Sequence, residues 1–197
     1  MIDAGGNHTS AIDGNGKLWT WGRNGYGQLG IGNLITKYEP MQVGTETTWV
    51  LVSAGDDQTI AKKASGTLWG FGKNLLGQLG DGTTVSKVSP VQITSATNWY
   101  QFDTGTAHTL ALKNDSTLYA WGYNSNGQLG DGTTVNKTVP TAIDGSGWLS
   151  VDIGYFDSFA LKSDSSLWSW GYNVIGQLGD GTVVDKNIPT QIIVLGW

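Results

Sequence analysis

One unit of about fifty residues is repeated four times along this chain. The phrase Gly-Gln-Leu-Gly occurs at residues 27–30, 77–80, 127–130 and 176–179, so its spacings are 50, 50 and 49 residues. A repeat of this length is a single supersecondary unit, which buries its apolar faces only by stacking on copies of itself. The periodicity predicts a single repeat domain over residues 1–197, with units at about 1–48, 49–98, 99–147 and 148–197.

The composition narrows the class of protein. Thirty glycines among 197 residues favour many tight turns between short strands. The net charge is −5 and the eleven basic residues form no cluster, which argues against a nucleic-acid partner. The absence of cysteine excludes disulfides, cysteine-based zinc sites and a thiol nucleophile. No apolar run approaches ~18 residues, so we expect no membrane insertion. Met1 falls directly inside a repeat, so we expect no signal peptide.

The repeated unit has the alternation of a β-strand. In the run Leu-Trp-x-Trp-Gly, Trp19 and Trp21 fall on one side of the strand and Leu18 on the other. A small residue lies between the two aromatic positions of each copy, and we expect it to face a large aromatic residue of the next copy. These small residues are Thr20, Gly70, Ala120 and Ser169.

Four short antiparallel strands fit into each unit. In the second unit we expect strands at 49–55, 58–63 and 67–72, followed by an edge strand near 90–93 that begins with Pro90. Turn residues such as Asp13-Gly14-Asn15-Gly16 separate the runs, as hairpins require. Four-stranded units arranged around an axis make a β-propeller, so the predicted fold class is all-β.

The longest repeated phrase resembles a known family. Residues 121–133 read Trp-Gly-x-Asn-x-x-Gly-Gln-Leu-Gly-Asp-Gly-Thr, and this pattern resembles the RCC1-type repeat (regulator of chromosome condensation) along the whole chain. Segments such as 108–113 and 119–122 are also similar to bacterial β-lactamase inhibitor propellers. The resemblance implies a propeller, which in this family usually has seven blades. The family's founding activity, nucleotide exchange on a small GTPase, uses an extra hairpin for which units of 49–50 residues leave no room.

Four RCC1-like blades leave the state of the ring open. Trp197 holds the first position of a unit whose next strand would be residues 1–5. The chain therefore forms a small four-bladed ring, half of a two-chain ring completed by a homodimer, or a partial ring cut from a longer propeller. Bare end blades would leave apolar surface in water, which costs a free energy of roughly 25 cal/mol per Å² of exposed area. We favour the homodimer or the longer propeller, because a four-bladed ring needs much steeper curvature.

The polar residues that recur suggest structural roles. His8 and His108 hold the same repeat position in different blades, so we expect each to bond a neighbouring turn and not to form a metal or catalytic cluster. Aspartate before Gly-Thr is typical of an Asx turn, whereas calcium needs six or more oxygen ligands. We therefore expect no catalytic residues, no metal and no cofactor. The three aspartates are Asp81, Asp131 and Asp180.

A lysine recurs in register in all four units, after the Gly-Gln-Leu-Gly phrase. We expect it to form an ion pair between blades or a hydrogen bond to a carbonyl group, with a ring-shaped anion site as the alternative. These lysines are Lys37, Lys87, Lys137 and Lys186.

Function is expected where the copies differ, because the repeated residues already pack the blades. The sequence indicates a non-enzymatic module that recognises a partner protein through variable loops. The candidate partner-binding residues are Tyr26, Leu75, Leu76, Tyr155, Phe156, Val174 and Ile175.

Two other functions fit the same pattern. A carbohydrate-binding propeller would bind a glycan once per blade, using the asparagines that recur at 24, 74, 124 and 173. A purely structural, self-assembling repeat fragment would bind only copies of itself. The low charge and the abundance of Thr, Asn and Gly favour an extracellular, cell-surface or virion setting in a bacterial or viral system.

Overall fold

A computed structural model describes residues 1–193, and in this range the regular structure consists of β-strands. The strands form four antiparallel sheets of four strands each, and every sheet uses four strands that are consecutive in the chain. We call these sheets blades 1 to 4. None of the described residues forms a helix long and apolar enough to cross a membrane. The predicted all-β fold of four-stranded blades is confirmed.

The strand boundaries follow the repeat. Blade 1 consists of β1 (Ile2–Ala4), β2 (His8–Ile12), β3 (Leu18–Gly22) and β4 (Lys37–Gln42). Blade 2 consists of β5 (Trp49–Ala54), β6 (Gln58–Lys63), β7 (Leu68–Gly72) and β8 (Lys87–Gln92). Blade 3 consists of β9 (Trp99–Thr104), β10 (His108–Lys113), β11 (Leu118–Gly122) and β12 (Lys137–Ile143). Blade 4 consists of β13 (Trp148–Ile153), β14 (Asp157–Lys162), β15 (Leu167–Gly171) and β16 (Lys186–Ile192).

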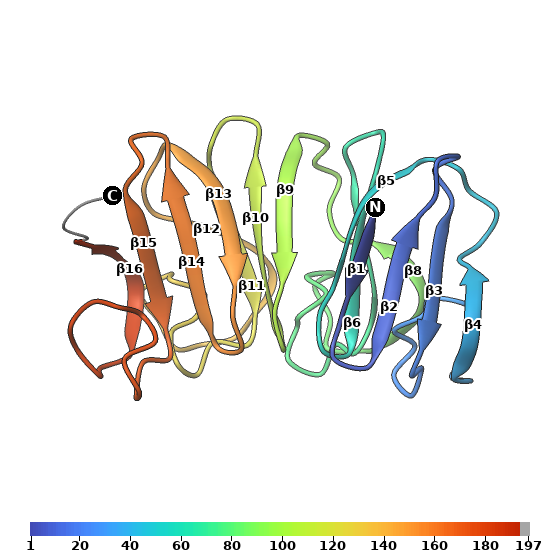
Figure 1. Cartoon of the computed structure of the whole chain (residues 1–197), viewed down its shortest axis with the longest axis horizontal. Helices are drawn as coiled ribbons and strands as arrows, with labels where there is room; N and C mark the ends of the chain where they lie inside the picture. The colour runs from blue at the N-terminus through green and yellow to red at the C-terminus, as the bar shows by residue number, and fades with distance from the viewer. Residues whose placement is uncertain (194–197) are drawn as a thin grey trace.

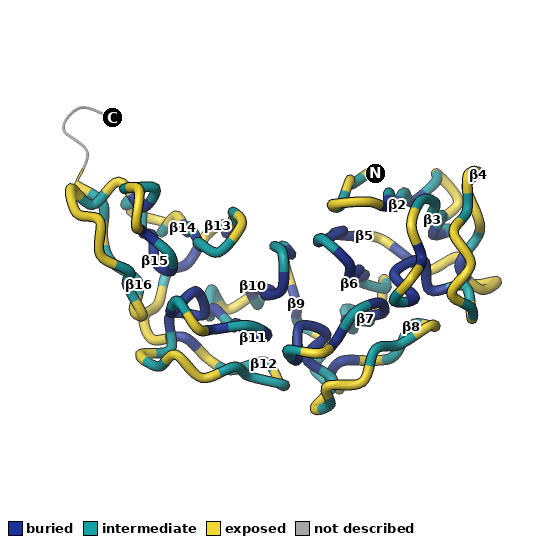
Figure 2. Tube along the Cα trace, turned by 90° about the horizontal axis from the view of Figure 1, so that it is seen from below, coloured by how far each residue is buried: buried dark blue, intermediate teal, exposed yellow. Residues whose placement is uncertain are grey.

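The blades fan out around an axis but do not close into a ring (Figures 1 and 2). The first strand of each blade lies nearest the axis and the fourth lies outermost, where most exposed residues are found (Figure 2). The described residues therefore form an open arc, which excludes the small four-bladed ring and fits both half of a two-chain ring and part of a longer propeller. Trp197, expected to hold the first position of a unit whose next strand is residues 1–5, lies outside the described residues.

The apolar core consists of three separate clusters, one at each boundary between blades. At the boundary of blades 3 and 4, Leu110 and Leu118 of blade 3 pack against Trp148 and Trp170 of blade 4. All four side chains are at most 2% exposed. Burying a large apolar side chain contributes roughly 1.5–3 kcal/mol, so each blade is stabilised chiefly by its neighbour.

One aromatic ring of each later blade packs against a glycine of the blade before it. The ring of Trp121 lies over Gly80, where an added Cβ atom would come within 2.7 Å of the indole nitrogen. The same indole N–H donates a hydrogen bond of 3.0 Å to the carbonyl oxygen of Gln78. Trp170 repeats this arrangement on Gln128 at 2.9 Å. The ring thus lies on the final glycine of the Gly-Gln-Leu-Gly phrase, which must lack a side chain, and bonds to its glutamine.

Our expectation about the small residues of the third strands holds for Ala120, which belongs to the apolar cluster of Trp148 and Trp170 in the next blade, but not for Thr20 and Gly70. We expected Thr20, Gly70 and their equivalents Ala120 and Ser169 to face the aromatic ring of the next copy. Instead, Thr20 donates its hydroxyl hydrogen to the carbonyl oxygen of Leu29 at 2.7 Å, within its own blade. A Cβ atom on Gly70 would lie 3.1 Å from Ile60, also within its own blade. The glycine that ends Gly-Gln-Leu-Gly faces the ring.

The edge strand of blade 2 also differs from expectation. We expected Pro90 to begin the strand, but β8 begins at Lys87 and Pro90 lies inside it. The pairing of β7 with β8 shifts register between Gly70 and Gly72, so Pro90 lies opposite an irregularity in the ladder. Proline is tolerated at such a point because its missing N–H removes no regular ladder bond.

The two histidines bind hydroxyl groups of the next blade. His8 Nε2 lies 2.7 Å from Thr59 Oγ1, and His108 Nε2 lies 3.1 Å from Ser158 Oγ. Burial lowers the pKa of His108 to about 3. Burial also lowers the pKa of His8 to about 4, against the opposing effect of nearby carboxylates. Both imidazoles therefore stay neutral at pH 7 and join neighbouring blades, which agrees with the structural role predicted for them.

We predict that replacing His108 with glutamine flattens the acid limb of the stability curve. Unfolded histidine binds a proton below about pH 6.5, whereas folded His108 does so only near pH 3. Its contribution to stability therefore falls as pH drops from 6.5 towards 3, by up to about 1.4 kcal/mol per pH unit. Urea unfolding at pH 7, 6, 5 and 4 should give a shallower slope for His108→Gln than for the unmodified chain.

Glutamine suits this test because Gln58 already holds the same position in blade 2 and donates to the carbonyl oxygen of Gly105. The reverse substitution, Gln58→His, should steepen the slope. Burial raises the pKa of Asp103 to about 6, which acts in the opposite direction but cancels in the comparison. Parallel curves for the variant and the unmodified chain would show that His108 is not the titrating group.

Candidate functional site

Two sets of connections lie at the same end of all four blades. The start of β2 pairs with the end of β3, as His8 lies opposite Gly22, and the same register recurs in the other blades. The turns before each second strand therefore lie beside the loops that follow each third strand, along the lower edge of Figure 1. We call this surface the loop face. It comprises the turns 5–7, 55–57, 105–107 and 154–156 and the loops 23–36, 73–86, 123–136 and 172–185.

All seven candidate partner-binding residues belong to the loop face, although they come from three different blades. Tyr155 is 68% exposed, Leu75 is 58% exposed and Ile175 is 83% exposed. Val174 is also exposed, whereas Tyr26, Leu76 and Phe156 are half-buried. The exposed members of this set present apolar surface to solvent.

A buried asparagine holds each loop in one conformation. Asn74 Oδ1 accepts the backbone N–H of Leu79 at 2.9 Å, and its Nδ2 donates to Asp81 at 2.9 Å and to the carbonyl oxygen of Thr83 at 3.0 Å. The same role belongs to Asn24, Asn124 and Asn173, and all four are fully buried. These amides are used inside the fold, which removes the asparagine set proposed for a glycan.

The Asp-Gly-Thr loops are Asx turns, as the sequence predicts. Asp131 accepts the backbone N–H of Thr133 at 3.0 Å and its hydroxyl group at 2.8 Å, and it pairs with Lys137 at 3.1 Å. Partial burial would raise the pKa of Asp131, but the bonds from Thr133, Lys137 and Asn124 outweigh it and hold the pKa below its usual value. Among residues 1–193, no group of three or more His, Cys, Asp or Glu side chains could hold a metal ion.

The recurring lysines pair within a blade, so our expectation of ion pairs between blades is wrong. Lys87 lies 3.2 Å from Asp81 and Lys186 lies 3.1 Å from Asp180, in each case inside one blade. The register explains this, because Gly122 lies opposite Lys137 and brings that lysine back beside its own loop. In blade 1, Ile31 stands where the other copies have the aspartate.

Two cationic side chains lie beside a carboxylate on the loop face over blades 1 and 2. Lys73 lies 4.8 Å and Arg23 lies 5.8 Å from the ring centre of Tyr26. Both cations also approach Asp57, at 3.4 Å for Lys73 and 3.7 Å for Arg23. Asp57 further accepts Gln28 Nε2 at 3.0 Å, so it joins blade 2 to blade 1. Arg23 keeps 51% of its side chain exposed and is available to a partner.

The same face is aromatic over blades 3 and 4. The ring of Phe156 lies 4.5 Å from that of Tyr155, 5.6 Å from that of Tyr123 and 6.5 Å from that of Tyr172. We call these four residues the aromatic cluster. Sequence reasoning missed Tyr123 and Tyr172. Both occupy the x of Trp-Gly-x-Asn, where the first two copies have Arg23 and Lys73, so the divergence of this position could have revealed them.

A shallow basin lies at the centre, between the innermost turns. Its volume is about 310 Å³, and glycines from all four blades line it together with Tyr155. The turns pack tightly here, because a Cβ atom on Gly5 would lie 2.1 Å from the carbonyl oxygen of Gly55. Tyr155 thus connects the aromatic cluster to this central basin.

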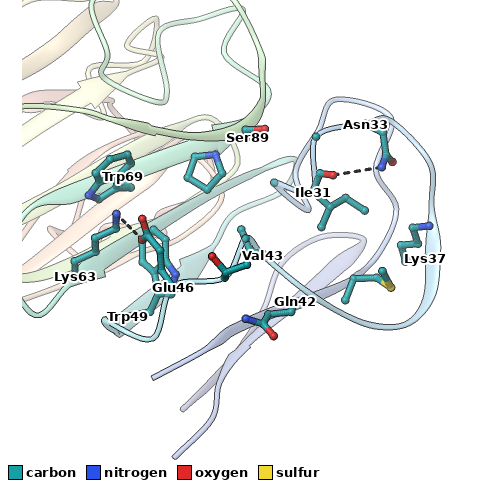
Figure 3. Close-up of a pocket in the computed structure, with 16 residues that line it drawn as sticks. Ile31, Asn33, Lys37, Gln42, Val43, Glu46, Trp49, Lys63, Trp69 and Ser89 are labelled. Carbon is teal, nitrogen blue, oxygen red and sulfur yellow. Dashed lines mark hydrogen bonds and ion pairs between the residues drawn. The ribbon is translucent and has the colours of Figure 1, made fainter. Parts of the chain in front are cut away.

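A larger pocket of about 550 Å³ lies between blades 1 and 2 (Figure 3). Its inner wall is built by Lys63, which pairs with Glu46 at 2.6 Å and lies 3.6 Å from the ring centre of Trp69. Lys113 and Lys162 stack on the equivalent rings of blades 3 and 4. Since this cation is already paired and the arrangement recurs with the repeat, the pocket wall belongs to the blade packing.

The sequence matches a repeat family over most of its length. The pattern described as "Regulator of chromosome condensation (RCC1) repeat" matches residues 15–61, 65–112, 115–161 and 164–196, and a second pattern of the same description matches residues 100–128. A curated relative, the Ultraviolet-B receptor UVR8 of Arabidopsis thaliana, is 44% identical over 43 residues, which are 22% of this chain and 10% of that protein.

Solved structures share the fold. Human WBSCR16 superposes with a TM-score of 0.89 at 24% identity, over 100% of this chain and 53% of that one. Prp20p of Saccharomyces cerevisiae superposes with a TM-score of 0.86 at 22% identity, over 98% of this chain and 50% of that one. This chain thus spans about half the length of these structures.

We predict that Asn124→Ala destabilises the chain by on the order of 3 kcal/mol. The change leaves the buried N–H of Leu129 without its acceptor and removes one of the three donors to Asp131 Oδ1. Ser125→Ala, in an exposed position of the same loop, should change the free energy of unfolding by less than about 0.5 kcal/mol. Urea unfolding followed by tryptophan fluorescence measures both. Equal stability of the two variants would contradict this role.

Proposed function

Because this chain belongs to the RCC1 repeat family, we propose that it is a protein-binding scaffold whose partner docks on the loop face. The observation that carries the proposal is the gathering of exposed apolar side chains on that face, where the repeats differ. Leu75, Tyr155 and Ile175 are each more than half exposed. Burial of such side chains supplies most of the free energy of protein association.

The distribution of roles along the repeat supports this function. The repeated asparagines, aspartates and lysines have their polar groups paired inside the blades, so they offer little to a ligand. Exposed apolar side chains recur at one position of every loop, whereas the seven candidate residues differ from blade to blade; the recurring ones are Ile35, Val85, Val135 and Val184. A surface of this kind recognises one shape in one orientation, as a protein partner requires, and lacks the repeated equivalent sites of a multivalent lectin.

The charge of the loop face indicates the chemistry of the partner. The aromatic cluster offers an apolar contact over blades 3 and 4, and the half-exposed guanidinium group of Arg23 offers a cationic hydrogen-bond donor over blades 1 and 2. A protein segment with apolar anchors at one end and acidic residues at the other would complement both. Solved structures of this fold describe protein partners: Prp20p is described with binding to Gsp1p and histones, and yeast RCC1 (Prp20) is bound to Kap60.

A glycan remains the second candidate, because the aromatic cluster could stack on a sugar ring. The buried asparagine amides weaken it, since sugar binding needs free polar groups beside the stacking ring. The arrangement favours binding over catalysis, so we propose no reaction at this face.

We predict that a photo-crosslinking residue at Tyr155 captures the partner in cells that make this protein. The same probe at Tyr100, which is 56% exposed but lies in β9 away from the loop face, is the control. Capture of one protein from Tyr155 and not from Tyr100 is expected. Equal capture from both positions would contradict a binding site on the loop face.

We further predict that Tyr155→Ala and Leu75→Ala each weaken binding of the purified partner by about tenfold or more, which corresponds to about 1.4 kcal/mol. Val50→Ala, 47% exposed in β5, is the matched control and should leave affinity unchanged. Titration calorimetry measures the dissociation constants, and circular dichroism checks that the fold is intact. Unchanged affinity in both loop-face variants would overturn the proposal.

A further inference from the structure

The three boundaries between blades are built from the same contacts. A hydroxyl group of the later blade donates to the carbonyl oxygen of a glutamine in the earlier blade: Thr59 to Gln28 at 2.9 Å, Thr109 to Gln78 at 3.2 Å and Ser158 to Gln128 at 2.7 Å. A backbone N–H of the later blade also reaches a carboxylate of the earlier blade at two boundaries, Ala54 to Asp3 at 2.7 Å and Ile153 to Asp103 at 2.9 Å. Every boundary therefore has an accepting face and a donating face.

Blade 4 presents an accepting face with no described residue against it. Gln177 is partly exposed, whereas the equivalent Gln28, Gln78 and Gln128 are fully buried. Leu161 is 38% exposed, although Leu112 at the same position is fully buried. Gly179 is the equivalent of Gly80 and Gly130, each of which is covered by a tryptophan ring. A Cβ atom placed on Gly179 would have only Ile192 within reach, at 3.9 Å, so no described ring covers this glycine.

Blade 1 presents the matching donating face. Thr9 and Trp21 are partly exposed. Their equivalents in the other blades are fully buried; these are Thr59, Thr109 and Ser158 for the hydroxyl group and Phe71, Trp121 and Trp170 for the ring. Ile2, on the same side of the sheet, is 68% exposed. One chain thus carries the two complementary halves of a fourth boundary, at opposite ends of the arc (Figure 2).

We propose that a second copy of this chain covers both faces. Blade 1 of each copy docks on blade 4 of the other, so that two identical boundaries close a ring of two chains. Thr9 Oγ1 and Trp21 Nε1 donate to the carbonyl oxygen of Gln177 of the second copy, and the ring of Trp21 covers Gly179. Asp152 of the second copy accepts the N–H of Ala4, as Asp103 accepts that of Ile153.

A second copy suits these faces better than an unrelated partner. Each uncovered group on blades 1 and 4 is equivalent to a group that is already paired at an internal boundary. Docking of a second copy would therefore repeat an interface that the fold already contains three times. Because each contact joins different faces of the two chains, the assembly is head to tail, and it closes when the second copy completes the turn. This inference is independent of the partner on the loop face.

The test measures the mass of the full chain by light scattering after gel filtration. The expected mass is twice the 21.0 kDa of one chain. Thr9→Arg places a long cation on the donating face and Leu161→Arg places one on the accepting face, so each variant alone should run as a single chain. Val85→Arg, 62% exposed in a loop of blade 2, is the matched control and should keep the mass of two chains.

An equimolar mixture of the two variants separates head-to-tail docking from other arrangements. The intact accepting face of Thr9→Arg can bind the intact donating face of Leu161→Arg, so the mixture should regain the mass of two chains through one boundary. Docking of like faces predicts no recovery and would overturn the proposal. Near-ultraviolet circular dichroism, which reports on packed tryptophans, checks that each variant is folded.

A monomeric unmodified chain would also overturn the proposal and leave the two faces to further blades of a longer protein. Larger open assemblies would overturn ring closure by two chains. Association that both arginine variants leave intact would place the interface elsewhere and would be equally decisive against it.

Discussion

The packing of an aromatic ring on a bare glycine of the preceding blade is the contact on which the rest of the structure depends. Trp121 on Gly80 shows how it works: the ring needs the space where a side chain would stand, and its N–H needs the carbonyl group of Gln78. The contact combines apolar burial with a satisfied polar group, which makes it directional. Because each blade supplies a ring on one side and a glycine on the other, the blades can follow one another only in a fixed order.

That directional packing also determines what the surface can do. The polar residues that recur with the repeat are occupied in holding loops and blades together, as Asn74 and Asp131 illustrate. Several of the groups that remain free differ between repeats. Over blades 3 and 4 they form an aromatic cluster around Phe156, and over blades 1 and 2 they leave the cation of Arg23 exposed. The loop face is therefore chemically uneven although its framework is regular.

Sequence patterns predicted local features well and contacts between segments less well. The Asx turns at Asp81 and its equivalents follow from aspartate before Gly-Thr, because the bonds close within a few residues. The predicted ion pair between blades was wrong, because the partner of each recurring lysine depends on the register between the third and fourth strands. The alternation of apolar and polar residues does not determine that register. Tyr123 was missed for a similar reason, since its contact with Phe156 joins two blades.

The sequence by itself determined that the chain consists of four β-blades of one kind, because a repeated alternating pattern can bury its apolar faces only against copies of itself. It also determined which residues vary and so which could carry specificity. Tertiary structure alone decided that Gly80 and not Gly70 receives the aromatic ring. It also decided that the arc stays open and that the variable residues of three blades share one face (Figure 1). These outcomes depend on how twisted sheets pack at an angle to one another, and that angle is set by contacts between residues about fifty positions apart.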